Sequence, residues 1–130
     1  MSRFDSHAVG RWSLRIDTAY CALLGIAVVL TAGVIAEGIA LHPLAITAAG
    51  VIVVVWAGAI AWMLRLMRLR RALWVVMTVN IVAGIAVALA SGLAATPLIA
   101  FAVLAIAIDV LLFAASQAVA LRGLRPGTVS

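Results

Sequence analysis

Apolar residues fall into four long stretches of this chain, at residues 18–36, 44–64, 72–90 and 98–121, and short polar or turn-forming segments separate them. A membrane-spanning helix needs about 20 mostly apolar residues, and each stretch has about that length. Pro43 and Pro97 stand at the starts of the second and fourth stretches, where a missing backbone N–H costs least. The pattern predicts an all-α protein, a bundle of four transmembrane helices that forms a single membrane domain over residues 1–130.

Composition supports this class and excludes several others. The chain has 130 residues, of which 68% are hydrophobic and 10% charged, whereas soluble domains are about half apolar and a quarter charged. The single cysteine, Cys21, excludes an internal disulfide and a Cys-x-x-Cys site. No histidine cluster, nucleophile with a base, or glycine-rich phosphate loop is present in the sequence. We therefore predict no enzymatic activity, no cofactor and no metal site.

Arginine placement predicts the orientation in the membrane. All nine basic residues are arginines, with three in residues 1–15, four in residues 65–71 and two in residues 122–130, and the turns at 37–43 and 91–97 have none. By the positive-inside rule, both termini and the 65–71 segment are cytoplasmic, and the composition is typical of a bacterial cytoplasmic (inner) membrane protein. The arginines flank apolar spans, so we expect them to meet anionic phospholipids or an anionic partner surface rather than nucleic acid. The residues concerned in the 65–71 segment are Arg65, Arg68, Arg70 and Arg71.

Two further segments allow more than one interpretation. In residues 1–15, Phe4, Ala8 and Trp12 recur every four positions, which is typical of a short interfacial helix, although a mobile tail is the alternative. Residues 37–44 (EGIALHPL) resemble residues 91–98 (SGLAATPL) at an offset of 54. The likeness indicates either two duplicated hairpins in parallel orientation, or turns that converge on Gly and Pro for local reasons.

Asp109 is the most unusual residue of the apolar stretches. It lies ~18 Å from the cytoplasmic end of the fourth span at a rise of ~1.5 Å per residue, and an ionised carboxylate at mid-membrane costs ~2.5–3.5 kcal/mol on insertion scales. No arginine is predicted at that depth. We therefore expect Asp109 to face the bundle interior, a cavity or another chain, and to be either protonated or paired with a partner's cation.

Other polar residues fall near the same depth or on the same helix face. They are Thr31 in the first span, Asn80 in the third, and Ser116 and Gln117, which follow Asp109 in the fourth. Together they predict an intramembrane polar seam. The seam has three interpretations: a proton or ligand path, a docking site for another subunit, or interhelical hydrogen bonds of ~0.6–2 kcal/mol each that only hold the helices together.

The basic entry to the first span, together with Asn80, Asp109, Phe113 and Gln117, resembles the small four-helix membrane proteins of actinobacteria and related bacteria, including DoxX-like proteins. That resemblance implies a compact four-helix bundle and no particular activity. The chain also resembles the small multidrug resistance proteins in size and span number. Those proteins carry an essential glutamate within the first span, whereas Asp17 and Glu37 are expected here at the ends of that span.

Two functions remain after these exclusions. The first is a non-catalytic accessory or assembly subunit of a larger bacterial membrane complex, with other membrane subunits or further copies of the chain as partners. The alternative is a small proton-coupled transporter or a lipophilic-ligand-binding membrane protein that uses Asp109.

Overall fold

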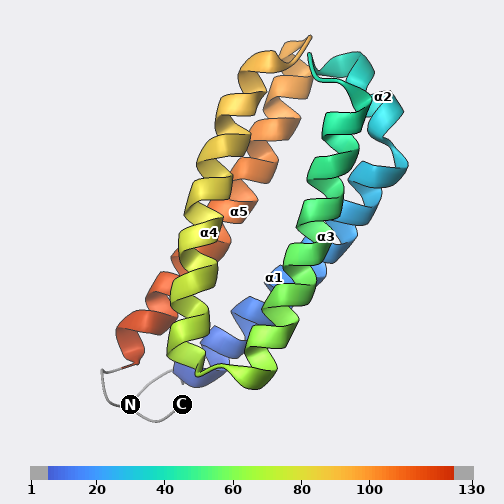
Figure 1. The fold of residues 1–130 in the computed structure, drawn as a ribbon. Coiled ribbons are helices and arrows are strands. Elements are labelled where there is room, and N and C mark those ends of the chain that lie inside the picture. Colours follow the sequence, from blue (N-terminus) through green and yellow to red (C-terminus); the bar gives the residue numbers. More distant parts are fainter. Residues whose placement is uncertain (1–5, 125–130) are drawn as a thin grey trace.

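The computed structural model describes residues 6–124, which are almost entirely helical. The elements in order are α1 (Ser6–Leu30), α2 (Ala32–Gly38), α3 (Pro43–Leu66), α4 (Leu69–Ala90), η1 (Ser91–Leu93) and α5 (Pro97–Gly123) (Figure 1). Four of them, α1, α3, α4 and α5, are long and apolar enough to cross a membrane. The predicted all-α, four-helix architecture is confirmed, and by length and composition the chain is a multi-pass helical membrane protein.

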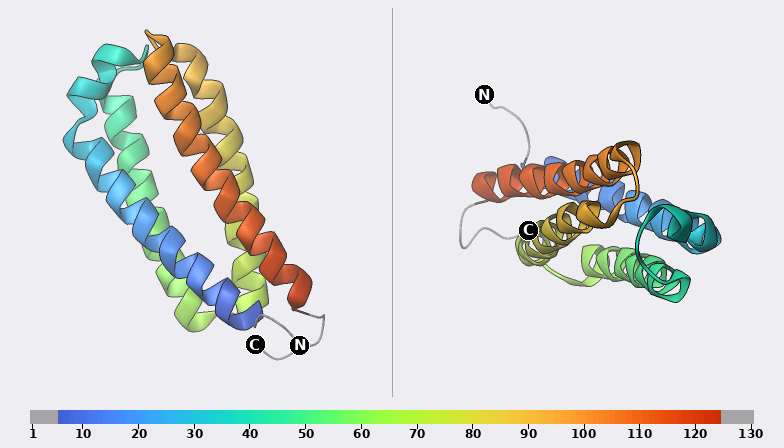
Figure 2. Two further views of the ribbon diagram at one scale, coloured as in Figure 1. Left: turned by 180° about the vertical axis from the view of Figure 1, so that it is seen from behind. Right: turned by 90° about the horizontal axis from the view of Figure 1, so that it is seen from above.

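The helices form two hairpins that lie side by side. One hairpin pairs α1 with α3 and the other pairs α4 with α5, as both side views show (Figures 1 and 2). The start of α1, the α3–α4 connection and the end of α5 lie together at one end of the bundle, here called the arginine end. The two connections within the hairpins lie at the opposite end, here called the turn end.

At the turn end the two hairpins are joined through their backbones. The Ala40 amide donates to the Leu93 carbonyl at 3.0 Å, and the Ala95 amide donates to the Gly38 carbonyl at 2.8 Å. Ile39 and Ala94 form an isolated antiparallel bridge between these contacts. The paired segments are the two that resemble each other in sequence. A twofold axis along the bundle would produce this antiparallel pairing, although the duplication itself stays a prediction.

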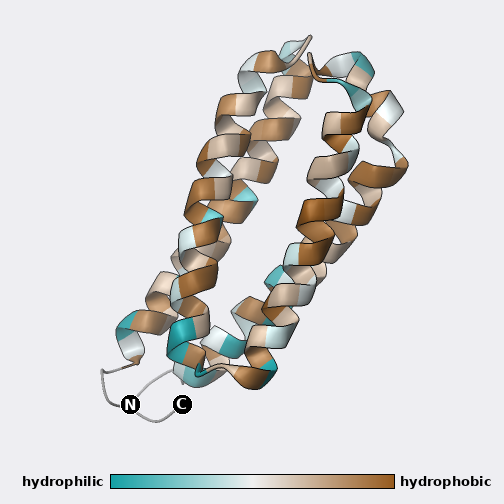
Figure 3. Ribbon diagram, viewed as in Figure 1, coloured by the Kyte–Doolittle hydropathy of each residue, from teal (hydrophilic) through white to brown (hydrophobic). Residues whose placement is uncertain are grey.

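The main hydrophobic core lies at the arginine end, where the helices of both hairpins meet. Its buried members are Leu14, Ile60, Met63, Leu69, Ala72, Leu73, Val76, Ala120, Leu121 and Leu124. Many large apolar side chains outside it are exposed along the helices, and apolar residues run along all four long helices (Figure 3). Such a surface suits contact with lipid chains, because lipid does not penalise exposed leucine or isoleucine as water does.

The first helix differs from the predicted span. It begins at Ser6 and ends at Leu30, rather than running over residues 18–36. The predicted start is too late because the charged residues Arg11, Arg15 and Asp17 lower the hydropathy of the first turns. In the helix, Arg11 and Arg15 are exposed while Asp17 is buried. Residues 6–15 therefore belong to α1 and not to a separate interfacial helix, and residues 1–5, with Phe4 of the proposed apolar face, lie outside the described residues.

The helix breaks at Thr31, between α1 and α2. Its backbone leaves the helical region at φ −115° and ψ 17°, and its hydroxyl donates to the Ala27 carbonyl at 2.6 Å. A threonine hydroxyl that bonds the carbonyl four residues earlier often accompanies a bend. The short α2 carries the chain onward to the turn end.

The other helix boundaries lie within a few residues of the predicted ones. Pro43 and Pro97 are the first residues of α3 and α5, as predicted. The His42 Nδ1 accepts from the Leu44 amide at 3.1 Å, and the Thr96 hydroxyl accepts from the Ile99 amide at 3.2 Å. These two side chains satisfy amides that the first turn of a helix leaves without a backbone partner.

A glycine contact brings α1 and α3 close together. A Cβ added at Gly25 would lie 2.7 Å from the Gly50 carbonyl oxygen and 3.0 Å from the Val54 amide nitrogen. Because these are backbone atoms, the helices have to separate to accept a side chain. We expect Gly25→Ala to lower the free energy of unfolding by about 1–3 kcal/mol, measured by thermal unfolding in a mild detergent.

Gly58→Ala is the matched control, because no atom lies within 4 Å of a Cβ built at Gly58. In a helix interior, alanine is more favourable than glycine by up to about 1 kcal/mol. The control should therefore be neutral or stabilising. Equal effects of the two substitutions would show that the close approach of α1 and α3 does not limit stability.

Candidate functional site

A buried polar cluster joins the middle of α1 and the middle of α4 to the last third of α5. The Asp17 Oδ2 accepts from the Asn80 amide nitrogen at 2.6 Å and from the Gln117 amide nitrogen at 2.9 Å. The Asn80 Nδ2 also lies 3.2 Å from the Gln117 Oε1. All three side chains are buried, with exposures of 1% for Asp17, 3% for Asn80 and 0% for Gln117.

A cysteine and a serine pair extend the cluster. The Cys21 thiol, one turn after Asp17, donates to the Asp17 Oδ1 at 3.3 Å. One turn before Asp17, the hydroxyls of Ser13 and Ser116 lie 2.6 Å apart. The buried face of α1 therefore carries polar and small residues at helical spacing, from Gly10 through Ser13, Asp17 and Cys21 to Gly25.

In this arrangement the Asp17 carboxylate is a shared acceptor for three neutral donors. An ionised carboxylate only accepts hydrogen bonds, and here two amides and a thiol are directed at it. Within residues 6–124 no arginine pairs with Asp17, and Trp56 Nε1 is the only buried side-chain N or O atom left without a partner. The cluster can therefore join three helices by interhelical hydrogen bonds.

Asp109 lies in a second polar cluster, on the outer side of α1 and α5. The Tyr20 hydroxyl donates to the Asp109 Oδ2 at 3.1 Å, and the ring of Tyr20 meets that of Phe113 edge to face at a centroid distance of 5.3 Å. Asp109 is exposed at the surface of the bundle. A shallow pocket of about 420 Å³ lies over it, lined by Tyr20, Asp109, Leu112, Phe113 and Ser116.

The predicted seam is thus divided. Asn80 and Gln117 meet in the buried cluster, and Ser116 lies next to it through Ser13. Asp109 does not join them, and the expectation that it faces the bundle interior is wrong for this single chain. Asp109 lies beside a pocket instead, and its contact with another chain stays a prediction. Thr31 takes no part in either cluster, because its hydroxyl is used within its own helix.

The predicted arginine group is also divided. Arg65 lies in the last turn of α3, and Arg68 is the residue just before α4. Arg65, Arg68 and Arg71 are exposed. Arg70 instead donates from its Nη1 to the Leu124 carbonyl at 2.6 Å, which fastens the end of α5 to the start of α4. Arg70 therefore has a structural contact that the sequence did not predict.

Sequence reasoning missed Asp17 and Tyr20 as site residues. The predicted boundary of the first span falls at Asp17, so this acid is expected at the end of the span rather than within it. The available signal was the spacing of Ser13, Asp17 and Cys21, which repeats every four residues on one helix face. Among the described residues, no group of three or more His, Cys, Asp or Glu side chains could hold a metal ion.

No family model, curated protein or solved structure matches this chain. Its function therefore has to be inferred from the bundle and its two polar clusters. The likeness to DoxX-like proteins stays a resemblance that rests on a few residues.

Proposed function

We propose that this chain is a non-catalytic subunit of a larger membrane assembly, in a bacterial cytoplasmic membrane. It docks through the face of α1 and α5 that carries Tyr20 and Asp109, here called the Asp109 face. The exposed position of Asp109, well inside a span, is the observation that supports this proposal.

The cost of leaving Asp109 against lipid supports a partner. A carboxylate in the hydrocarbon region costs ~2.5–3.5 kcal/mol on insertion scales, and Tyr20 satisfies only one of its oxygens. A second transmembrane chain that presents a cation or hydrogen-bond donors would satisfy the other. The pocket of about 420 Å³ beside it, bordered by Leu112 and Phe113, offers room for a partner side chain.

The proposed orientation places the arginine end in the cytoplasm. Arginines are concentrated in the segments at this end, and the two turns at the opposite end have none. This is the asymmetry of the positive-inside rule. Arg3 and Arg125 contribute to it, and both lie outside the described residues.

The second candidate function is a small proton-coupled transporter or a lipophilic-ligand-binding protein. The same pocket supports it, because a carboxylate, a phenol and an aromatic ring border an otherwise apolar surface. Asp17 adds to this candidate, since an acid does lie within the first helix. In this case Asp109 would meet a ligand or a proton rather than another chain.

Replacing Asp109 by leucine tests the first candidate. We expect Asp109→Leu to weaken association with the partner about 3- to 30-fold, corresponding to interhelical hydrogen bonds of ~0.6–2 kcal/mol. Thermal stability of the isolated chain should be unchanged or higher. Association is measured by gentle detergent extraction of the tagged full chain from its native membrane, followed by quantitative mass spectrometry. Ile108→Ala, on the same helix and also exposed, is the control and should retain the partner.

Photocrosslinking locates the contact. A photoreactive amino acid in place of Leu112, which is 61% exposed beside Asp109, should crosslink the co-purifying chain. The same probe in place of Val82, which is 63% exposed on α4, should not. Recovery of the chain alone, without a crosslink at position 112, would contradict the subunit proposal and favour the second candidate, for which proton-coupled flux is the next measurement.

A further inference from the structure

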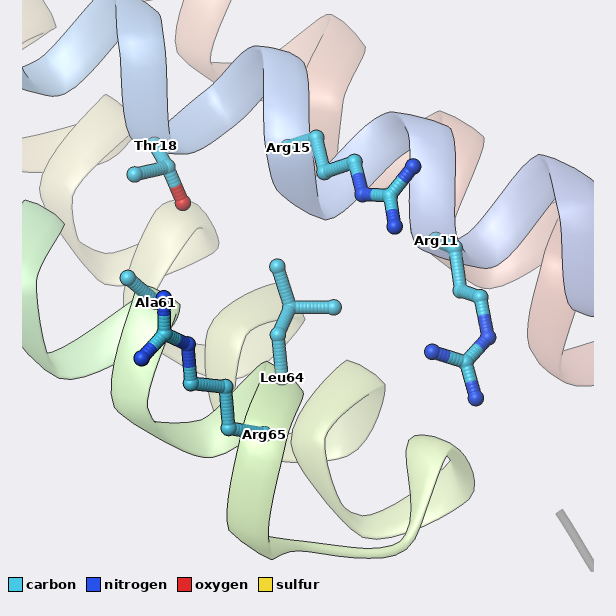
Figure 4. A pocket seen from close by; sticks show the side chains of 6 residues that line it. All are labelled: Arg11, Arg15, Thr18, Ala61, Leu64 and Arg65. Atoms are coloured by element: carbon cyan, nitrogen blue, oxygen red, sulfur yellow. The ribbon is translucent and has the colours of Figure 1, made fainter.

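A second surface feature, distinct from the Asp109 face, is a basic groove between α1 and α3 at the arginine end. Its volume is about 410 Å³, and Arg11, Arg15, Thr18, Ala61, Leu64 and Arg65 line it. Arg11 and Arg15 project from successive turns of α1, and Arg65 reaches from the last turn of α3 along the other side of the groove (Figure 4).

We propose that this groove binds the headgroup of an anionic phospholipid through the guanidinium groups of Arg11, Arg15 and Arg65. Guanidinium groups are planar, always charged and able to give paired hydrogen bonds to phosphate oxygens. Three of them around one groove form a concentrated positive charge that only an anion can balance.

The arginines are available for such a ligand. The sequence has four acidic residues, of which Asp17, Glu37 and Asp109 fall within the described ranges. No ion pair joins any of these three to the groove arginines, and Asp17 is instead held by amides from α4 and α5. The hydroxyl of Thr18 donates to the Leu14 carbonyl at 2.8 Å, so its proton is already used. Among the residues that the structure describes, the charge of the groove therefore comes from the arginines alone.

The position of the groove favours a lipid over a free anion. Trp12 lies between Arg11 and Arg15 along α1, and Trp62 follows Ala61 on α3. The two tryptophans are 61% and 57% exposed. Exposed tryptophans of this kind mark the depth of lipid headgroups. Ala61 and Leu64 add apolar surface to the groove, which suits contact with the glycerol or upper acyl region of a lipid. The three positive charges of the groove balance a headgroup with two phosphates better than a headgroup with a single negative charge.

Lipid retention by the full chain provides the test. The purified protein is reconstituted in nanodiscs of phosphatidylcholine with a small fraction of either phosphatidylglycerol or cardiolipin, and retained lipid is measured by native mass spectrometry after detergent release. We expect the unmodified chain to retain cardiolipin above phosphatidylglycerol and phosphatidylcholine. The triple variant Arg11→Gln, Arg15→Gln, Arg65→Gln should bind the anionic lipid about 100-fold more weakly, since each arginine near an anionic lipid surface contributes about a factor of five.

A matched variant removes the same charge from elsewhere at the arginine end. Arg68→Gln, Arg71→Gln, Arg122→Gln changes three exposed arginines outside the groove, and it should retain the lipid. Equal loss in both triple variants would overturn the site in favour of general electrostatic attraction. Displacement of the lipid by millimolar inorganic phosphate would overturn the lipid assignment in favour of a free anion.

A lysine variant tests the groove even if the triple glutamine variant does not fold. The variant Arg11→Lys, Arg15→Lys, Arg65→Lys keeps the charge but loses the paired geometry of the guanidinium groups. It should fold and show lipid binding that is weaker than that of the unmodified chain. Binding of undiminished strength would contradict a guanidinium site. The groove lies between α1 and α3 and the Asp109 face between α1 and α5, so either can fail without the other.

Discussion

Asp17→Ala is expected to lower the free energy of unfolding by about 2–4 kcal/mol, because it leaves the Gln117 amide nitrogen buried without an acceptor and removes one of the two acceptors of Asn80. The loss should be measured by denaturant or thermal unfolding in a mild detergent. Thr78→Ala is the control, because the Thr78 hydroxyl is exposed and bonded within its own helix to the Trp74 carbonyl. Its effect should stay within about 0.5 kcal/mol.

A triple apolar variant distinguishes a structural cluster from a functional one. Replacing both partners of a buried hydrogen bond by apolar groups of similar shape is often neutral or stabilising. We therefore expect Asp17→Leu, Asn80→Leu, Gln117→Leu to recover most of the stability that Asp17→Ala loses. A stable triple variant that still associates with the proposed partner would identify the cluster as interhelical hydrogen bonding alone. Stability of Asp17→Ala within 0.5 kcal/mol of the unmodified chain would show that the cluster does not hold the helices together.

The four helices could be predicted because the bilayer imposes a length and a composition on each span. A helix in hydrocarbon has to satisfy its own backbone and needs about 20 apolar residues, and both demands are visible in the sequence. The prolines at the starts of α3 and α5 fixed those two boundaries well. The start of α1 was missed because a hydropathy criterion averages over the helix circumference, whereas Arg15 faces outward and Asp17 inward.

The polar clusters were harder to predict, because depth does not determine the direction in which a side chain points. The predicted seam includes Asn80 and Gln117, which meet in the buried cluster. Asp17, which joins them, is predicted at a span end. Asp109 is expected to face the bundle interior, a cavity or another chain, and it lies on the outer face beside Tyr20 and a shallow pocket. The α5 sequence is apolar on all sides, so it gives no preferred face from which its rotation could be deduced.

Thiol labelling tests the orientation of the bundle in the membrane, because an introduced cysteine is labelled from outside the cell or is not. We expect Ala95→Cys, at the turn end, to react with a membrane-impermeant maleimide in intact bacterial cells. Leu66→Cys, beside the α3–α4 connection, should react only after the membrane is permeabilised. Both positions are exposed, so a difference in labelling reports the side of the membrane and not burial. The physical reason is the arginine asymmetry, which resists transfer of the arginine end across the membrane.

The native thiol provides the background control for this experiment. Cys21 is buried and bonded to Asp17, so the unmodified chain should remain unlabelled on both sides. Labelling of Leu66→Cys in intact cells, without labelling of Ala95→Cys, would invert the topology. The groove of Arg11, Arg15 and Arg65 would then face the outer leaflet, and the anionic lipid it binds would have to come from that side. Labelling of both positions in intact cells would indicate a dual orientation, which the bias of nine arginines to none argues against.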